Sequence, residues 1–171
     1  SEDVEKKLNQ RMLGLIPWLE HDKKLDLPVR SFFDTSKTQF SEAVRTLRTS
    51  LSLLNIESEK QAIMVTSSVP KEGKTTVSLN LAFAYGQLGK TLIVDADLRR
   101  PSVGKQFNIP SYHPGTSNII LNTHKFEECI VRDEASNVDI LAAGAVPSNP
   151  QELLAGKGFE KLMEHAKLHY D

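Results

Sequence analysis

Apolar residues recur along this chain in two patterns that predict alternating strands and helices. Short, largely apolar runs indicate buried parallel strands at 62–65 and 91–94, and alternation at 137–141 indicates a third. Between them, apolar residues spaced three and four apart predict helices. These expected helices span residues 40–54, 77–88, 103–107, 115–121, 126–131, 150–154 and 159–169. The order predicts an α/β fold of three layers with a mostly parallel sheet.

The first part of the chain carries weaker patterns. A charged stretch predicts a short helix at 3–10, and the apolar segment at 12–17 is a candidate edge strand. Residues 22–36 are polar and irregular, which predicts a linker across the surface. We therefore divide the chain into an N-terminal segment and linker, 1–38, and a domain, 39–171.

The expected helix at 40–54 has an apolar stripe and a charged face. Ser41 is the expected N-cap, and the stripe consists of Val44, Leu47, Leu51 and Leu54. Glu42, Arg45 and Arg48 step by three residues and lie mostly opposite the stripe. Spacing alone favours a solvated face with a local glutamate–arginine pair, worth about 0.3–0.5 kcal/mol.

A loop containing Gly73, Lys74 and Thr75 joins the strand at 62–65 to the helix that follows. Strand, Gly-Lys-Thr loop and helix are the context of a P-loop, whose backbone N–H groups bind phosphate oxygens at a helix N-terminus. Lys74 then reaches the β- and γ-phosphates of ATP, and the Thr75 hydroxyl ligates Mg²⁺. Ser68 replaces the first glycine of the usual pattern. The expected nucleotide-binding residues are Ser68, Lys71, Glu72, Gly73, Lys74, Thr75 and Thr76.

Two carboxylates, Asp95 and Asp97, follow the strand at 91–94. They stand at the carboxyl end of a strand, the edge where open α/β sheets bind ligands. There they can hold the water ligands of Mg²⁺ or accept a hydroxyl proton. We expect Lys74, Asp95 and Asp97 to be catalytic, and Thr75 and Asp95 to hold the metal. The structural alternative is an acidic turn that caps a helix near Pro101.

Composition and charge limit the kinds of partner and environment that this protein can have. The 171 residues carry a net charge of −1, which gives no sign of a nucleic-acid partner. No apolar run approaches the roughly 20 residues of a transmembrane helix. The single cysteine, Cys129, is expected in the core, and His165 and His169 at a solvated helix end. Tyr112 lies in a loop of prolines and serine and is expected to be exposed.

The motifs together resemble the bacterial tyrosine kinases, from about residue 40 to the end. The P-loop is followed by a strand and Asp-x-Asp-x-Arg, Glu42-x-x-Arg45-x-x-Arg48 matches the ExxRxxR signature of that family, and residues 144–154 resemble its GxxPxNPxELL segment. The related ATPases of chromosome partitioning and division-site selection carry an extra lysine where this chain has Val69. This departure favours the kinase branch.

The resemblance implies an ATP- and Mg²⁺-dependent autokinase that phosphorylates tyrosines and regulates exopolysaccharide or capsule synthesis and chain length. It implies that Glu42, Arg45 and Arg48 contact a neighbouring subunit near its nucleotide site. It further implies three partners: other copies of the chain, a membrane-spanning chain-length determinant region, and the export machinery. Residues 4–8 and 13–17 look like the juncture of the fused type. The resemblance therefore implies a cytoplasmic domain of a bacterial inner-membrane protein.

In the resembled kinases, a strand ending in the Walker B aspartate and a tyrosine-rich tail follow the position of Asp171. We therefore expect a P-loop fold truncated before the Walker B strand, and no activity from these 171 residues alone. Two alternatives stay open: a partitioning-type ATPase that switches between monomer and dimer, and a non-catalytic scaffold of a polysaccharide export complex.

Overall fold

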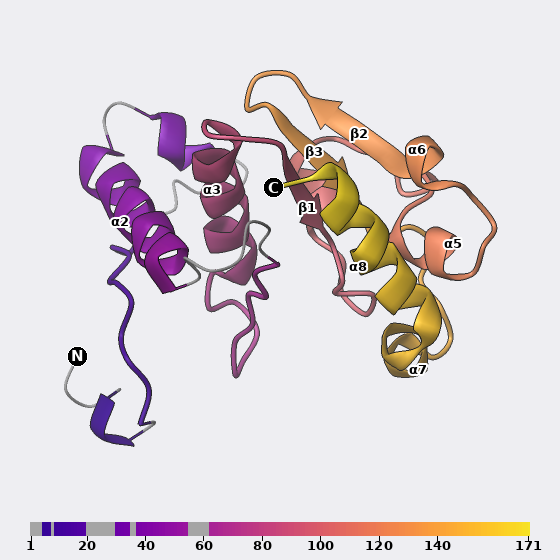
Figure 1. Ribbon diagram of the computed structural model, residues 1–171, viewed down its shortest axis with the longest axis horizontal. Helices are drawn as coiled ribbons and strands as arrows, with labels where there is room; N and C mark the ends of the chain where they lie inside the picture. The colour runs from indigo at the N-terminus through magenta and orange to yellow at the C-terminus, as the bar shows by residue number, and fades with distance from the viewer. Residues whose placement is uncertain (1–4, 8, 20–29, 35–36, 55–61) are drawn as a thin grey trace.

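The chain folds into helices and short strands in this computed structural model, which describes residues 5–7, 9–19, 30–34, 37–54 and 62–171 (Figure 1). Residues 5–7 are helical. The elements that follow are η1 (Ser31–Phe33), α2 (Thr38–Leu54), α3 (Lys74–Gly86), β1 (Thr91–Val94), α4 (Val103–Gln106), α5 (Thr116–Ile120), α6 (Phe126–Cys129), β2 (Ile130–Asp133), β3 (Val138–Leu141), α7 (Pro150–Ala155) and α8 (Lys157–His169).

The sheet has the strand order β1-β3-β2. β1 and β3 are parallel, with Ile93 opposite Ile140. β2 is antiparallel to β3, and Val131 lies opposite Ile140 from the other side. Asn137 closes the β2–β3 turn at φ +60°, a left-handed conformation that asparagine tolerates better than most residues. The expected third parallel strand, β3, is therefore confirmed.

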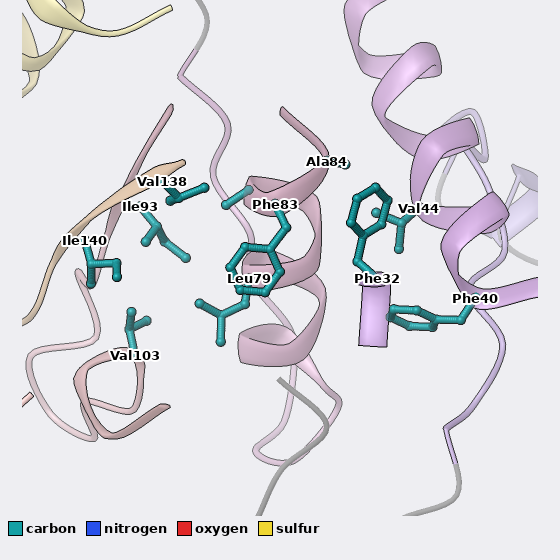
Figure 2. Close-up of a cluster of buried hydrophobic side chains, with 11 residues drawn as sticks. Phe32, Phe40, Val44, Leu79, Phe83, Ala84, Ile93, Val103, Val138 and Ile140 are labelled. Carbon is teal, nitrogen blue, oxygen red and sulfur yellow. The ribbon is translucent and has the colours of Figure 1, made fainter. Parts of the chain in front are cut away.

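Both faces of the sheet are covered, which gives the expected three layers. On one face, Ile93, Val138 and Ile140 pack with Leu79 and Phe83 of α3 (Figure 2). The other face packs under α5 and α8 (Figure 1). The hydrophobic side chains on this side include Leu92, Val94, Leu141, Ile120 and Leu162, with Leu153 of α7 beside them. Alternate residues of β1 point to opposite faces, as a strand period of two requires.

The expected strand at 62–65 is wrong. Residues 62–67 form no regular element, and Met64 is 87% exposed. A strand needs a hydrogen-bonded partner, and none of the described residues pairs with this segment. Residues 12–17 are also irregular rather than an edge strand. In both segments the local apolar pattern predicted a buried strand. Such a pattern does not show whether another strand is available to pair with the segment.

Two helix predictions need correction. The helix expected at 126–131 divides into α6 and β2, because β-branched Ile130 and Val131 pair with β3 instead of continuing the helix. Helix α2 begins at Thr38, so Ser41 lies inside the helix, and its hydroxyl donates to the Phe32 carbonyl oxygen (2.9 Å) rather than capping α2. Leu54 of the expected stripe is exposed.

The segment that resembles GxxPxNPxELL builds the connection from β3 into α7. Gly144 has φ +76° and packs against the backbone of Gly115. Asn149 is the N-cap of α7, where its side-chain oxygen accepts the N–H of Glu152, and Pro150 occupies the first helical position. The Asn-Pro-x-Glu spacing therefore has a local structural role as a helix start.

Residues 30–33 pack against the domain through the buried Ser31 and Phe32, and are not the surface linker that their composition predicted. Ser31 and Phe32 are each 3% exposed, and Phe32 lies between α2 and α3 (Figure 2). Arg30 pairs with Asp133 at 2.6 Å, and its guanidinium lies over the rings of Phe83 and Phe107. The contacts of Arg30 and Phe32 therefore hold this segment against the domain.

The Arg30–Asp133 pair predicts a pH-dependent contribution to stability. Burial by itself raises the pKa of Asp133, but the hydrogen bonds from Arg30 and Ser136 outweigh it and hold this pKa below its ordinary 3.8. Ionised Asp133 therefore stabilises the fold above that pH, and the contribution is lost as the pH falls through the lowered pKa.

We expect Asp133→Asn to lower the unfolding free energy by about 1 kcal/mol at neutral pH, and the difference from the parent to shrink in acid. Urea unfolding between about pH 7 and pH 3 measures both effects. Arg30→Gln is the matched variant and should show the same pH dependence. If the difference in unfolding free energy between the parent and Asp133→Asn stays constant across this pH range, the predicted pH-dependent contribution of the ion pair is refuted.

Candidate nucleotide-binding site

The loop before α3 has the shape of a phosphate cradle. Gly73 is the N-cap of α3 at φ +86°, and no side chain caps the helix there. Lys71 also has a positive φ, +68°. An added Cβ on Gly73 would have open space, so it is the backbone conformation that favours glycine. The N–H groups of the first turn of α3 thus keep their capacity to bind an anion.

Two side-chain contacts hold the loop in shape. The Lys74 ammonium donates to the Ser67 hydroxyl at 2.9 Å and so reaches back across the loop. The Glu72 carboxylate accepts the Val69 N–H at 3.2 Å and the Ser68 hydroxyl at 3.4 Å. The bond from Val69 lowers the pKa of Glu72. Glu72 and Ser68 therefore shape the loop, while Lys74 crosses it.

A serine that sequence reasoning missed joins the loop to the aspartates. The Thr75 hydroxyl lies 2.7 Å from the Ser102 hydroxyl, and the Ser102 N–H donates to the Asp95 carboxylate at 3.1 Å. Thr75 and Asp95, the two expected metal ligands, are therefore connected through one residue. The sequence offered one indication of a role for this serine: Ser102 stands immediately before the expected helix at 103–107, the position of an N-cap.

Asp95 lies under the loop that follows β1. It is 4% exposed, and its oxygens accept the backbone N–H groups of Asp97 (3.1 Å), Ser102 (3.1 Å) and Val103 (3.0 Å). Burial raises the pKa of this carboxyl although the three bonds favour its ionised form. Asp95 therefore organises the turn into α4, as the capping alternative predicted.

Asp97 is exposed at the same edge of the sheet, where one of its oxygens accepts the Arg100 N–H at 3.0 Å. The structure thus separates two carboxylates that looked alike in the sequence: one lies under the loop, and the other faces solvent. Together with Thr75 and the first turn of α3, these groups fit a nucleoside triphosphate with Mg²⁺, because they supply N–H donors, an ammonium, a hydroxyl and carboxylate oxygen.

The expected interface residues make contacts within the domain. Glu42 and Arg45 form the local pair at 2.7 Å, and the Arg45 guanidinium lies 5.1 Å from the centre of the Phe32 ring. Arg48 donates to the carbonyl oxygen of Ala84 in α3 at 2.7 Å. The last turn of a helix leaves carbonyls without helical partners, and the long arginine side chain reaches one of them. Arg48 therefore does not lie on a free face opposite the stripe, which corrects that expectation.

These contacts predict unequal effects for the two arginines. Arg48→Ala removes a charge-assisted hydrogen bond to a carbonyl of a residue that is 0% exposed, so we expect a loss of about 1–3 kcal/mol in unfolding free energy. Arg45→Ala is the matched control, and we expect a loss below about 1 kcal/mol. Chemical denaturation of both variants decides the point; equal effects would mean that the Ala84 contact contributes nothing.

The cysteine and the tyrosines are either held by contacts within the fold or exposed in a loop. Cys129 is fully buried, as expected, and burial raises the pKa of its thiol to about 11. The Tyr85 hydroxyl donates to Arg48 O at 3.3 Å, and the Tyr170 hydroxyl to Asp139 at 2.7 Å. Tyr112 is 87% exposed, which confirms that prediction.

Comparison with known proteins identifies the class. No protein-family model matches the chain. It is 35% identical over 136 residues to the tyrosine-protein kinase YwqD of Bacillus subtilis, covering 79% of this chain and 57% of that protein. It is 33% identical over 172 residues to the tyrosine-protein kinase Etk of Escherichia coli K12, covering 100% of this chain and 23% of Etk. The chain thus spans little more than half the length of YwqD and about a quarter of Etk.

Solved structures agree with these relatives. The kinase domain of Escherichia coli Etk superposes with a TM-score of 0.87 at 31% identity, covering 100% of this chain and 69% of that one. The chimerical protein CapA2B2 superposes with a TM-score of 0.84 at 34% identity, covering 99% of this chain and 71% of that one. Within the described residues, no helix is both long and apolar enough to cross a bilayer.

The layered α/β fold and the loop before α3 define a P-loop nucleotide-binding protein. The chain belongs to the family of bacterial tyrosine-protein kinases, and it matches 69% of the solved kinase domain of Etk. These relatives favour the kinase interpretation over the partitioning-ATPase and scaffold alternatives.

Proposed function

We propose that this chain carries the nucleotide site of an ATP-dependent protein-tyrosine autokinase. The observation that supports it most is the connection from the uncapped first turn of α3 to the carboxylates after β1, through Thr75, Ser102 and Asp95. The connection supports the proposal because phosphoryl transfer needs a phosphate-binding turn with acidic groups beside it.

In the proposed reaction, a tyrosine oxygen attacks the γ-phosphorus of ATP, the bond to the β,γ-bridging oxygen breaks, and ADP leaves. The first-turn N–H groups of α3 and the Lys74 ammonium bind the β- and γ-phosphates and stabilise the charge that develops on them. Mg²⁺, when bound, supplies further neutralisation of the phosphates, and Thr75 and Asp95 are the residues that would hold it. Asp97 is the exposed carboxylate that accepts the hydroxyl proton.

The proposed biological role follows the family resemblance. It is the control of exopolysaccharide or capsule synthesis and chain length, together with a membrane-spanning chain-length determinant region and the export machinery at the bacterial inner membrane. Self-association would use the face of α2 that carries Glu42, Arg45 and Arg48. Because Arg45 and Arg48 already have contacts within the domain, a contact with a second copy would have to add to those contacts or replace them.

Phosphotyrosine on the intact protein tests the proposal. We expect mass spectrometry to find phosphotyrosine on protein purified from its host, and none on a Lys74→Ala variant produced in the same way. Phosphotyrosine at equal levels on both would show that another kinase is responsible.

A further inference from the structure

We propose that Asn80 is a positioning residue for the nucleotide site. It would connect residues 30–33, which we call the docking segment, to the phosphate-binding turn of α3, so that docking of the segment raises nucleotide affinity. The inference rests on the proposed nucleotide site and adds to it a residue outside the P-loop.

Asn80 is a fully buried polar side chain with two backbone partners. Its side-chain oxygen accepts the Phe32 N–H at 2.8 Å, and its side-chain NH₂ donates to the Thr76 carbonyl at 2.7 Å. Both ends of the amide are therefore satisfied, one by the docking segment and one by α3. A side chain held this way has one orientation, since rotation would break both bonds.

The Thr76 end of this connection lies in the first turn of α3. Thr76 follows Lys74 and Thr75, the residues expected to contact phosphate and metal. The amide planes of this turn carry the N–H groups that face the anion, and small errors in their direction weaken phosphate binding. Asn80 thus fixes a carbonyl in the turn whose N–H groups do the binding.

The Phe32 end is anchored independently of Asn80. The Phe32 ring packs with Phe40 and Val44 between α2 and α3 (Figure 2), and its carbonyl accepts the Ser41 hydroxyl at 2.9 Å. Arg30 adds the ion pair with Asp133 and the contacts with Phe83 and Phe107. Changes at Arg30 can therefore alter the docking of the segment without touching either Asn80 or the P-loop.

Coupling between the docking segment and the nucleotide is reciprocal by thermodynamic linkage. If docking of the segment raises nucleotide affinity, bound nucleotide must hold the segment more firmly. The Phe32 amide reports this directly, because its hydrogen donates to Asn80. Its hydrogen exchange should slow when nucleotide binds.

The test is a double-mutant cycle on the intact protein with ADP as the probe. We expect Asn80→Ala to weaken ADP binding by about 5- to 150-fold, the usual range of allosteric coupling. Arg30→Gln should weaken ADP binding several-fold in the parent and have no further effect in the Asn80→Ala background. Leu162→Ala, in the core on the opposite face of the sheet, is the control for lost stability and should leave ADP affinity unchanged.

Unchanged ADP affinity in Asn80→Ala, or independent additive effects of the two substitutions, would overturn the proposal. If Asn80→Ala does not fold, exchange of the Phe32 amide in the parent and in Arg30→Gln decides instead. Slowing by ADP in the parent supports the coupling, and equal exchange with and without ADP refutes it. A parent protein that does not bind ADP at all would contradict the proposed nucleotide site itself, which separates the two failures.

Discussion

Lys74→Ala weakens ATP binding by about 10- to 150-fold in our account, while the unfolding free energy stays within about 1 kcal/mol of the parent. The expected loss of binding free energy is about 1.5–3 kcal/mol, because the substitution removes hydrogen bonds between an ammonium and phosphate oxygens. Stability is largely spared because the lysine contact in the fold is a single half-buried hydrogen bond to the Ser67 hydroxyl.

Isothermal titration calorimetry on the intact protein measures the affinity, and thermal unfolding checks the fold. Ser67→Ala is the matched control: it removes the intramolecular partner of Lys74 without removing the charge, and should change ATP affinity by less than about 10-fold. An ATP dissociation constant in Lys74→Ala equal to that of the parent would exclude this lysine from the site.

The second prediction with a large expected effect distinguishes Asp95 from Asp97. Asp95→Asn should lower the unfolding free energy by about 1–3 kcal/mol, since the amide NH₂ that replaces an oxygen cannot accept a backbone N–H. Asp95 accepts three such N–H groups, from Asp97, Ser102 and Val103, so at least one is left without its acceptor. Turnover should fall as well, because the loop that carries Asp97 is set by these bonds.

Asp97→Asn is the matched substitution on an exposed carboxylate. It should leave stability unchanged within about 0.5 kcal/mol and lower kcat more than ATP affinity, as expected of a group that accepts a proton during the reaction. Urea unfolding and initial rates on the two variants make the comparison. Equal losses of stability would contradict the distinction, and a parent-like kcat in Asp97→Asn would exclude its proton-transfer role.

The local hydrophobic pattern predicted those elements in which the spacing of apolar residues alone shows which face is buried. β1, β3, α3 and α8 were found because apolar spacing within each segment reflects the face that packs. The strand at 62–65 failed for the opposite reason, since pairing depends on another part of the chain. β2 was missed because its pairing with β3 outweighed a helical spacing at 126–131.

The candidate nucleotide-binding site shows the same difference between residues found from local spacing and residues whose partners are distant in the sequence. Lys74, Thr75, Asp95 and Asp97 were predicted because the P-loop spacing and the carboxyl end of a strand are visible in the sequence. Ser102 and Asn80 were not, because their hydrogen bonds are made to partners 27 and 48 positions away in the chain. No spacing rule encodes such contacts, and the sequence showed only a serine before a helix and an asparagine within one.

The measurement that tests the central claim most directly is the fate of the γ-phosphate. The intact protein is incubated with Mg²⁺ and ATP labelled with ³²P at the γ-position, and the label is divided between protein tyrosine and free phosphate. Our account predicts that label accumulates on tyrosine, in proportion to the ADP formed, and that Lys74→Ala abolishes this transfer. Release of all the label as free phosphate, with none on tyrosine, would identify an ATPase and contradict the account.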